Sequence, residues 1–305
     1  MAPPKSPPAL DAAIIGGGPA GLVAAVYLAR LRRSVAIVDA SESRLATIPR
    51  TRNYPGFPDG IAGPALLGAL REQAERYPIA HHAGHVDALE RIDDGFRLSW
   101  QGGEVTARLV LLASGTSDVV PAMPHLSQAL RKGLLRYCPV CDGYEVIDRK
   151  VGVLANGPAG VQEAVYLRHF TPHLTLFMTS DAQALAPAEH ERLAQAGIRL
   201  AEGAVESIRE WDGQIIARHG GSETACESLY SALGLEVHSA LAERVGARTD
   251  ESGYVLTDRH QETDAPGLYA AGDVVLGLNQ ITVAAGTAAI ASAAMHLALN
   301  RRDRR

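Results

Sequence analysis

Cys138 and Cys141 carry the most reactive side chains of this sequence and stand two residues apart in RYCPVCDGYE. Such a pair can be half of a metal site, a structural disulfide or a redox couple. Zinc normally takes four ligands, usually from two such pairs, and only Cys226 remains, far along the chain from the pair. Three cysteines in 305 residues form no disulfide framework, which is typical of a reducing compartment. We therefore predict a redox couple in a cytoplasmic protein, and no metal site.

The residue after the pair fits redox chemistry. Thiol–disulfide exchange needs a thiolate that attacks and a second thiol that resolves the mixed disulfide. Asp142 follows Cys141 directly, and a carboxylate there can carry the proton that each half-reaction moves. We therefore predict Cys138, Cys141 and Asp142 as the catalytic group, and Cys226 as a small buried hydrophobic residue.

Residues 12–40 have the pattern of a dinucleotide-binding unit. Their apolar spacing changes from strand to helix and back to strand, and Gly16, Gly18 and Gly21 fill the turn between the first strand and the helix. These glycines permit a tight turn, close approach of a pyrophosphate to the backbone, and close packing of the helix on the strand. Asp39 ends the second strand, where a carboxylate can accept ribose hydroxyls. We predict a dinucleotide site at this turn, with the helix N-terminus facing the phosphates.

A second copy of this unit lies further along the chain, where GPAG (18–21) recurs at 157–160 and AVYL (25–28) recurs at 164–167. Gly157 and Gly160 repeat two of the three glycines, but Ala155 stands in place of the first. Met178 replaces the acid, Asp181 stands three places later, and no arginine follows to hold a 2′-phosphate. The second copy is either a weak nucleotide pocket that favours NADH or a remnant of the fold with little affinity.

The two copies predict an α/β fold with two Rossmann-like domains. A formal charge of -5 argues against a nucleic-acid partner. No apolar run approaches the roughly 20 residues of a membrane span, so we expect no membrane association. Residues 1–10 read as a disordered lead-in, and Glu163, in the second helix, is expected to serve packing or the surface.

Five motifs in their order resemble the low-molecular-weight thioredoxin reductases. They are GGGPAG, NYPGFP, CPVCDGYE, the second GPAG and GLYAAGDV, and the resemblance covers about Asp11 to Asn300. It implies a FAD enzyme with its second nucleotide domain inserted into the first. Residues 1–117 and 236–305 would form the FAD domain, and 118–235 would form the NAD(P)-type insert carrying the CxxC. The resemblance also implies a homodimer and a thioredoxin-like partner.

The same resemblance implies roles for individual residues. Cys141 would be the thiolate facing the flavin, Cys138 would attack the substrate disulfide, and Asp142 would manage the thiol protons. Gly157 and Gly160 would belong to the NAD(P) site. The residues that would hold FAD are Gly16, Gly18, Pro19, Ala20, Gly21, Asp39, Asn53, Gly272, Asp273, Gln280 and Ile281.

The sequence departs from the family pattern at two places. The HRRxxxR run that grips the NADPH 2′-phosphate is absent, and FMTSDAQAL stands there instead. A Gly-Gln pair near the flavin is also absent, and Arg44-Leu45-Ala46-Thr47 occupies its region. A disulfide reductase fed by NADH, by weakly bound NADPH or by a ferredoxin-type donor fits these departures. The alternatives are a flavin-dependent oxidase of small dithiols that uses oxygen, and a non-enzymatic flavin-binding regulatory module.

Overall fold

The computed structural model describes residues 10–180 and 185–304, so the expected lead-in, except Leu10, and Asp181 lie outside the described part. The chain forms two compact units, each described by itself below. The first comprises Met1–Thr47, Gly63–Ser117 and Glu236–Arg305, and the second comprises Ile48–Ala62 and Asp118–Leu235. The second unit thus includes Ile48–Ala62, which we expected in the first. An ion pair of 3.8 Å between Arg52 and Glu145 ties this segment to the rest of the second unit.

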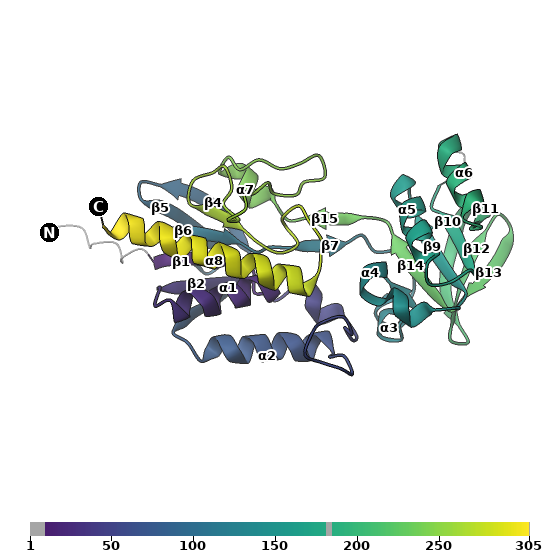
Figure 1. The fold of residues 1–305 in the computed structure, drawn as a ribbon, viewed down its shortest axis with the longest axis horizontal. Coiled ribbons are helices and arrows are strands. Elements are labelled where there is room, and N and C mark those ends of the chain that lie inside the picture. Colours follow the sequence, from purple (N-terminus) through teal and green to yellow (C-terminus); the bar gives the residue numbers. More distant parts are fainter. Residues whose placement is uncertain (1–9, 181–184, 305) are drawn as a thin grey trace. The chain divides into compact units, whose positions relative to one another are not determined.

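The first unit is built on a seven-stranded sheet (Figure 1). Its parallel part has the order β3-β2-β1-β6, with β16 parallel to β6, and β4, β5 and β6 form an antiparallel meander. The strands are β1 (Leu10–Ile15), β2 (Val35–Asp39), β3 (Ile79–Ala83), β4 (Val86–Ile92), β5 (Gly95–Trp100), β6 (Gly103–Leu112) and β16 (Leu268–Ala270). The helices are α1 (Pro19–Arg30), η1 (Arg44–Thr47), α2 (Gly63–Glu75), α7 (Ala240–Arg244) and α8 (Ile281–Asp303). The carboxyl-terminal halves of the central strands β1 and β6 are apolar and buried, as expected for a parallel sheet covered on both faces.

The second unit has a seven-stranded sheet of related design, in the order β13-β12-β11-β10-β9-β14-β8. Its strands are β8 (Leu135–Arg136), β9 (Val151–Ala155), β10 (Leu174–Met178), β11 (Arg199–Trp211), β12 (Gln214–His219), β13 (Ser222–Cys226) and β14 (Ser228–Ala232). Its helices are α3 (Leu126–Arg131), α4 (Pro139–Asp142), η2 (Gly143–Val146), α5 (Pro158–Leu167) and α6 (Pro187–Gln195). Two short strands, β7 (Thr116–Asp118) and β15 (Leu235–Val237), pair where the chain passes between the units.

The strand registers match the internal repeat. In the first unit Ala12 pairs with Val35, and in the second Val151 pairs with Leu174, so both pairs have the same separation along the chain (35 − 12 and 174 − 151). The offset between the two pairs also equals the offset between the two GPAG motifs (151 − 12 and 157 − 18). The predicted α/β class with two Rossmann-like units is confirmed.

Helix α8 corrects the expectation that no apolar stretch has the length of a membrane span. Among the described helices, α8 is the one with enough length and hydropathy to cross a membrane, and 28% of its apolar window is buried. Its hydropathy comes largely from alanines, which do not form the run of bulky apolar residues that is typical of a membrane span. The helix packs against α1 and β16, with Met295 and Leu299 fully buried, which are the contacts of a core helix in a folded unit.

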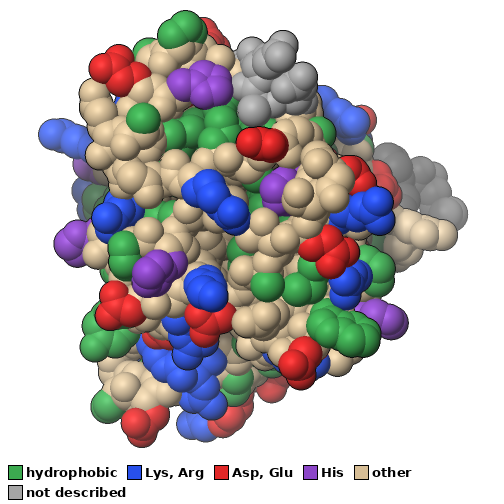
Figure 2. Space-filling model, turned by 90° about the vertical axis from the view of Figure 1, so that its right-hand side faces the viewer, with side chains coloured by type: hydrophobic (Ala, Val, Ile, Leu, Met, Phe, Trp, Pro, Cys, Tyr) green, Lys and Arg blue, Asp and Glu red, His purple; other side chains and the backbone are tan. Residues whose placement is uncertain are grey.

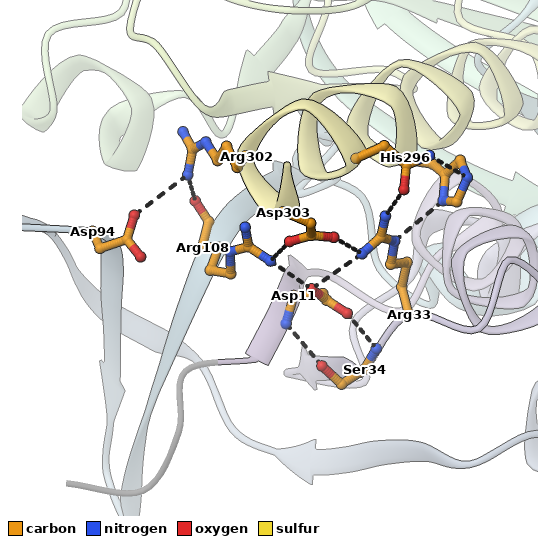
Figure 3. A network of polar contacts seen from close by, with 9 residues as sticks. Asp11, Arg33, Ser34, Asp94, Arg108, His296, Arg302 and Asp303 are labelled. Atoms are coloured by element: carbon orange, nitrogen blue, oxygen red, sulfur yellow. Dashed lines mark hydrogen bonds and ion pairs between the residues drawn. The ribbon is translucent and has the colours of Figure 1, made fainter. Parts of the chain in front are cut away.

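A polar network joins distant segments of the first unit (Figure 3). Asp303, at the end of α8, accepts hydrogen bonds from Arg33 (2.9 Å) and from Arg108 of β6 (2.7 Å). Arg108 also donates to Asp11 of β1 (3.2 Å), whose carboxylate accepts the backbone N–H of Ser34. The network therefore fastens the C-terminal segment to the strands formed by the first part of the chain.

One face of the molecule is shown in Figure 2. Basic, acidic and histidine side chains are interspersed across it, with apolar side chains between them.

Candidate functional site

The glycine turn between β1 and α1 needs its glycines for steric reasons. Gly16 has a φ of +103°, and a Cβ there would lie 2.4 Å from the carbonyl oxygen of Ala113. A Cβ on Gly21 would lie 1.9 Å from the carbonyl oxygen of Gly16, so the helix can pack this closely only without a side chain. Among the described residues, a Cβ on Gly18 would meet one atom within 4 Å, the Ser43 Oγ at 3.4 Å. The turn therefore has room for a ligand at Gly18.

Helix α1 begins directly after this opening. Gly18 is the N-cap, Pro19 is the first helical residue, and no side chain caps the helix. The first backbone N–H groups of a helix have no partner within the helix and attract anions. The turn and the helix start thus provide what a dinucleotide pyrophosphate requires.

Asp39, at the end of β2, is held against the same turn. Its Oδ1 accepts the backbone N–H groups of Gly17 (3.0 Å) and Ser41 (3.1 Å), and its Oδ2 lies 3.4 Å from Arg71 Nη2. A Cβ on Gly17 would lie 2.4 Å from the Asp39 carboxylate. Sequence reasoning missed this requirement for glycine, because the GxGxxG pattern leaves the second position open. Asp39 thus lies directly against the glycine turn.

The segment after β16 reaches the same region. Gly272 has a φ of +78°, and a Cβ there would lie 2.9 Å from the Cβ of Ala20 on α1. Gly272 also donates its backbone N–H to Thr287 of α8 (3.1 Å). This close packing brings Asp273 beside the glycine turn, where Arg44 Nη1 lies 3.4 Å from Asp273 Oδ2. The structure thus brings together predicted residues from the two ends of the chain.

Two further predicted parts of the site are the start of α8 and Asn53. Helix α8 begins at Ile281, with Gln280 as its N-cap and no side-chain cap, so a helix start lies where we expected one. Asn53 belongs to the second unit, where its Oδ1 accepts the hydroxyl of Thr51 (2.9 Å).

Cys138 and Cys141 form a disulfide in the second unit. Cys138 is the N-cap of α4, and its Sγ accepts the backbone N–H of Cys141 (3.2 Å). A hydrogen bond from a backbone N–H favours negative charge on the acceptor, so it would stabilise a Cys138 thiolate in the reduced protein. The third cysteine, Cys226, is buried as a free thiol, and burial raises its pKa to about 12.

Asp142 takes part in a partly buried polar network. Its Oδ2 accepts a hydrogen bond from Arg136 Nη1 (2.6 Å), and its Oδ1 accepts the hydroxyl of Tyr230 (2.8 Å). Both partners hold the carboxylate in one orientation. Burial, followed by the charge of Asp142, raises the pKa of Tyr230 far above its ordinary value, so its hydroxyl remains a donor.

Sequence reasoning missed both partners of Asp142. The sequence contained one indication for Tyr230. It stands in the short strand SLYSA, and a buried tyrosine hydroxyl requires a hydrogen-bond partner. Arg136 comes from β8, and nothing in its neighbourhood in the sequence indicates that it would meet Asp142.

Glu163 of α5 lies near this network. Its Oε1 is buried and has no hydrogen-bond partner among the described residues. Burial, followed by the charge of Asp142, raises the pKa of Glu163 to about 7. We expected packing or a surface role for this residue, whereas its environment makes it a carboxyl group that titrates near neutral pH.

The second glycine turn has lost parts of the nucleotide site. Ala155 ends β9 and is fully buried, and a Cβ on Gly160 would lie 2.0 Å from the Ala155 Cβ. Gly157 has open space around it among the described residues. Met178, at the position of Asp39, is fully buried, so this strand end offers no carboxylate to a ribose.

No group of three or more His, Cys, Asp and Glu side chains suited to a metal ion occurs in the described ranges.

The comparisons with known proteins agree with this arrangement. Residues 10–288 match the pyridine nucleotide-disulphide oxidoreductase family. The thioredoxin reductase of Peptoclostridium litorale is 29% identical over 92% of this chain and 94% of its own length. Among solved structures, the thioredoxin reductase of Streptococcus pyogenes has a TM-score of 0.89 at 28% identity, covering 97% of this chain and 100% of its own. The structure of HlmI has a TM-score of 0.88 at 30% identity, covering 97% of this chain and 94% of its own.

The match extends over both glycine turns and the cysteine pair, so it concerns the whole arrangement and not one nucleotide-binding motif. This chain belongs to the pyridine nucleotide-disulphide oxidoreductase family and is thioredoxin reductase-like within it.

Proposed function

We propose that this protein is a FAD-dependent thiol–disulfide oxidoreductase of thioredoxin reductase type. In this proposal the Cys138–Cys141 pair passes electrons between FAD and a disulfide or dithiol substrate. The observation that carries the proposal is the disulfide followed directly by an Asp142 carboxylate that Arg136 and Tyr230 hold in place. A structural disulfide would have no need of a carboxylate held in place at this position.

The first unit fits FAD, the cofactor of this family. The glycine turn and the start of α1 would hold the pyrophosphate, Asp39 a ribose, and Asp273 the ribityl–pyrophosphate part. When bound, FAD supplies a two-electron carrier that can be oxidised or reduced by a thiol pair.

The cysteines would perform the exchange with a disulfide substrate in two steps. The Cys138 thiolate attacks one substrate sulfur, which forms a mixed disulfide and releases the other sulfur as a thiolate. The Cys141 thiolate then attacks the Cys138 sulfur, which restores the Cys138–Cys141 disulfide and releases the second substrate thiolate. Asp142 would accept the thiol proton of the attacking cysteine and return it to a departing thiolate. In the opposite direction the same steps oxidise a dithiol.

The second unit supports a donor other than tightly bound NADPH. Met178 is buried where a ribose-binding acid would stand, and FMTSDAQAL contains no arginine or lysine for a 2′-phosphate. In the reductase direction we propose NADH, weakly bound NADPH or a ferredoxin-type protein as electron donor. The partner is then a thioredoxin-like protein or a small disulfide.

The same observation favours a second candidate, a flavin-dependent dithiol oxidase that transfers electrons to oxygen and needs no pyridine nucleotide. A non-enzymatic flavin-binding module gains no support, because the cysteine pair and the network around Asp142 are intact.

An anaerobic stopped-flow titration separates these functions. Bleaching of the flavin by NADH or by a reduced ferredoxin, at the rate of turnover, supports the reductase. Bleaching by dithiols alone, with peroxide formed on re-aeration, selects the oxidase, and rapid bleaching by tightly bound NADPH contradicts the donor assignment. Cys141→Ser should abolish electron exchange between flavin and thiols, and unchanged thiol turnover in that variant would refute the assigned role of the pair.

We also propose a cytoplasmic homodimer. Support for the dimer comes from α1 and α8, which pack together and expose Tyr27 (46%), Leu31 (38%), Ile290 (45%) and Leu297 (57%). Light scattering during size-exclusion chromatography tests the dimer, and the double variant Ile290→Glu/Leu297→Glu should shift it to monomer.

A further inference from the structure

Arg44 is a cation that the family pattern does not predict in its region. It opens η1 (Arg44–Thr47), five residues after Asp39 at the end of β2. Its Nη1 lies 3.4 Å from Asp273 Oδ2, and the two side chains are 25% and 22% exposed. An ion pair this far from bulk water is screened less by salt than one at the surface.

The residue before Arg44 lies beside the glycine turn. The Oγ of Ser43 is 3.4 Å from the position of a Cβ on Gly18, so this segment lies beside the open part of the glycine turn. Asp273 reaches the same region because Gly272 packs against Ala20 on α1. Arg44 therefore comes from a third segment and meets the other two at the carboxyl edge of the sheet.

The charges at this edge call for a cation. Two carboxylates lie here, Asp39 with Arg71 (3.4 Å) and Asp273 with Arg44 (3.4 Å). The pyrophosphate of FAD adds two negative charges, whereas the glycine turn offers only backbone dipoles. A phosphate close to Asp273 would be repelled unless a cation accompanies that carboxylate. A guanidinium has five N–H donors in a planar fork and can serve a carboxylate and a phosphate together.

We propose that Arg44 is a cofactor-binding residue whose guanidinium binds the pyrophosphate of FAD while it remains paired with Asp273. The inference rests on the proposed function, in which the first unit holds FAD. It also gives a role to Arg44-Leu45-Ala46-Thr47, the segment that departs from the family pattern, because this segment would bring a cation to the phosphates.

The test is reconstitution of the full-length apoprotein, followed by the fluorescence of the flavin. Wild type, Arg44→Gln and Arg44→Lys are titrated with FAD and with riboflavin, which lacks phosphate. Loss of a charge-assisted hydrogen bond should weaken FAD binding by about 10- to 100-fold in Arg44→Gln, and riboflavin binding by less than about twofold. Arg44→Lys keeps the charge and should lie between the two. The salt dependence of FAD binding should be shallower in Arg44→Gln than in wild type.

The matched control is Arg76→Gln, which removes an exposed arginine from an ion pair with Glu72 on α2 and should bind both flavins like wild type. FAD affinity in Arg44→Gln within about twofold of wild type would overturn the inference, as would equal losses for FAD and riboflavin. If Arg44→Gln does not fold, Arg44→Lys decides alone: a loss of FAD affinity with riboflavin affinity retained supports the inference, whereas FAD affinity equal to that of wild type, or equal losses for both flavins, refutes it. A wild-type protein that binds no FAD would overturn the proposed function itself, and with it this inference.

Discussion

Replacing Glu163 by glutamine should stabilise the protein above neutral pH and leave it unchanged in acid. The Glu163 carboxyl is buried near Asp142, and burial, followed by that neighbouring charge, raises its pKa from 4.5 to about 7. Glutamine has nearly the same shape and carries no charge. The substitution therefore removes the cost of ionising this buried group and little else.

The sign follows from proton linkage. Between pH 4.5 and 7 the folded protein holds the Glu163 proton while the unfolded chain releases it, so the free energy of unfolding falls as the pH rises. A pKa shift of this size lowers the free energy of unfolding of the wild type by at most about 3 kcal/mol. This loss is fully present above pH 7 and absent below the pKa of the unfolded chain. For a unit of this size that is on the order of 10 °C in melting temperature.

Differential scanning calorimetry of the holoenzyme at pH 4.5 and at pH 8 measures the effect. Glu163→Gln should melt several degrees above wild type at pH 8 and together with it at pH 4.5. The matched control is Glu191→Gln on α6, where the wild-type carboxylate is exposed and accepts a hydrogen bond from Gln195, and it should melt like wild type at both pH values. An equal gain at both pH values, or none at pH 8, would refute the reasoning about a buried, ionising carboxyl.

Three further predictions address the other parts of the molecule. Tyr230→Phe removes the 2.8 Å donor that positions the Asp142 carboxylate and should slow thiol turnover by roughly tenfold while flavin content stays at the wild-type level, and unchanged thiol turnover would contradict the assigned role of this network. Gly17→Ala places a Cβ 2.4 Å from the Asp39 carboxylate and should reduce the FAD content of the purified protein, measured as flavin absorbance per chain, while the disulfide remains reducible by small thiols. Asp303→Asn weakens the network of Figure 3. Because the arginine partners lower the pKa of the Asp303 carboxyl, the loss in melting temperature should be greatest near neutral pH and vanish as the pH falls below 3.8. A loss that persists in acid would contradict the charge argument.

Local patterns determined much of the architecture. Each strand–turn–helix–strand unit lies within one short continuous stretch of chain. Its glycines are required by close contacts between residues near one another in the chain, such as Gly21 with Gly16. The CxxC pair is equally local, so Cys138 and Cys141 were predicted as a pair and form a disulfide. The constant offset between the two units is visible in the sequence and recurs in the strand registers.

Contacts between distant segments were decided only by the tertiary structure. Tyr230 meets Asp142 from 88 positions away along the chain, and no spacing in the sequence encodes that contact. Arg44 likewise meets Asp273 across 229 positions. The environment of Glu163 also depends on burial, which one residue in a helix does not reveal. The sequence by itself therefore determined the two Rossmann-like units and the cysteine pair, whereas folding decided which charged side chains surround them, because the environment of a side chain depends on its neighbours in space.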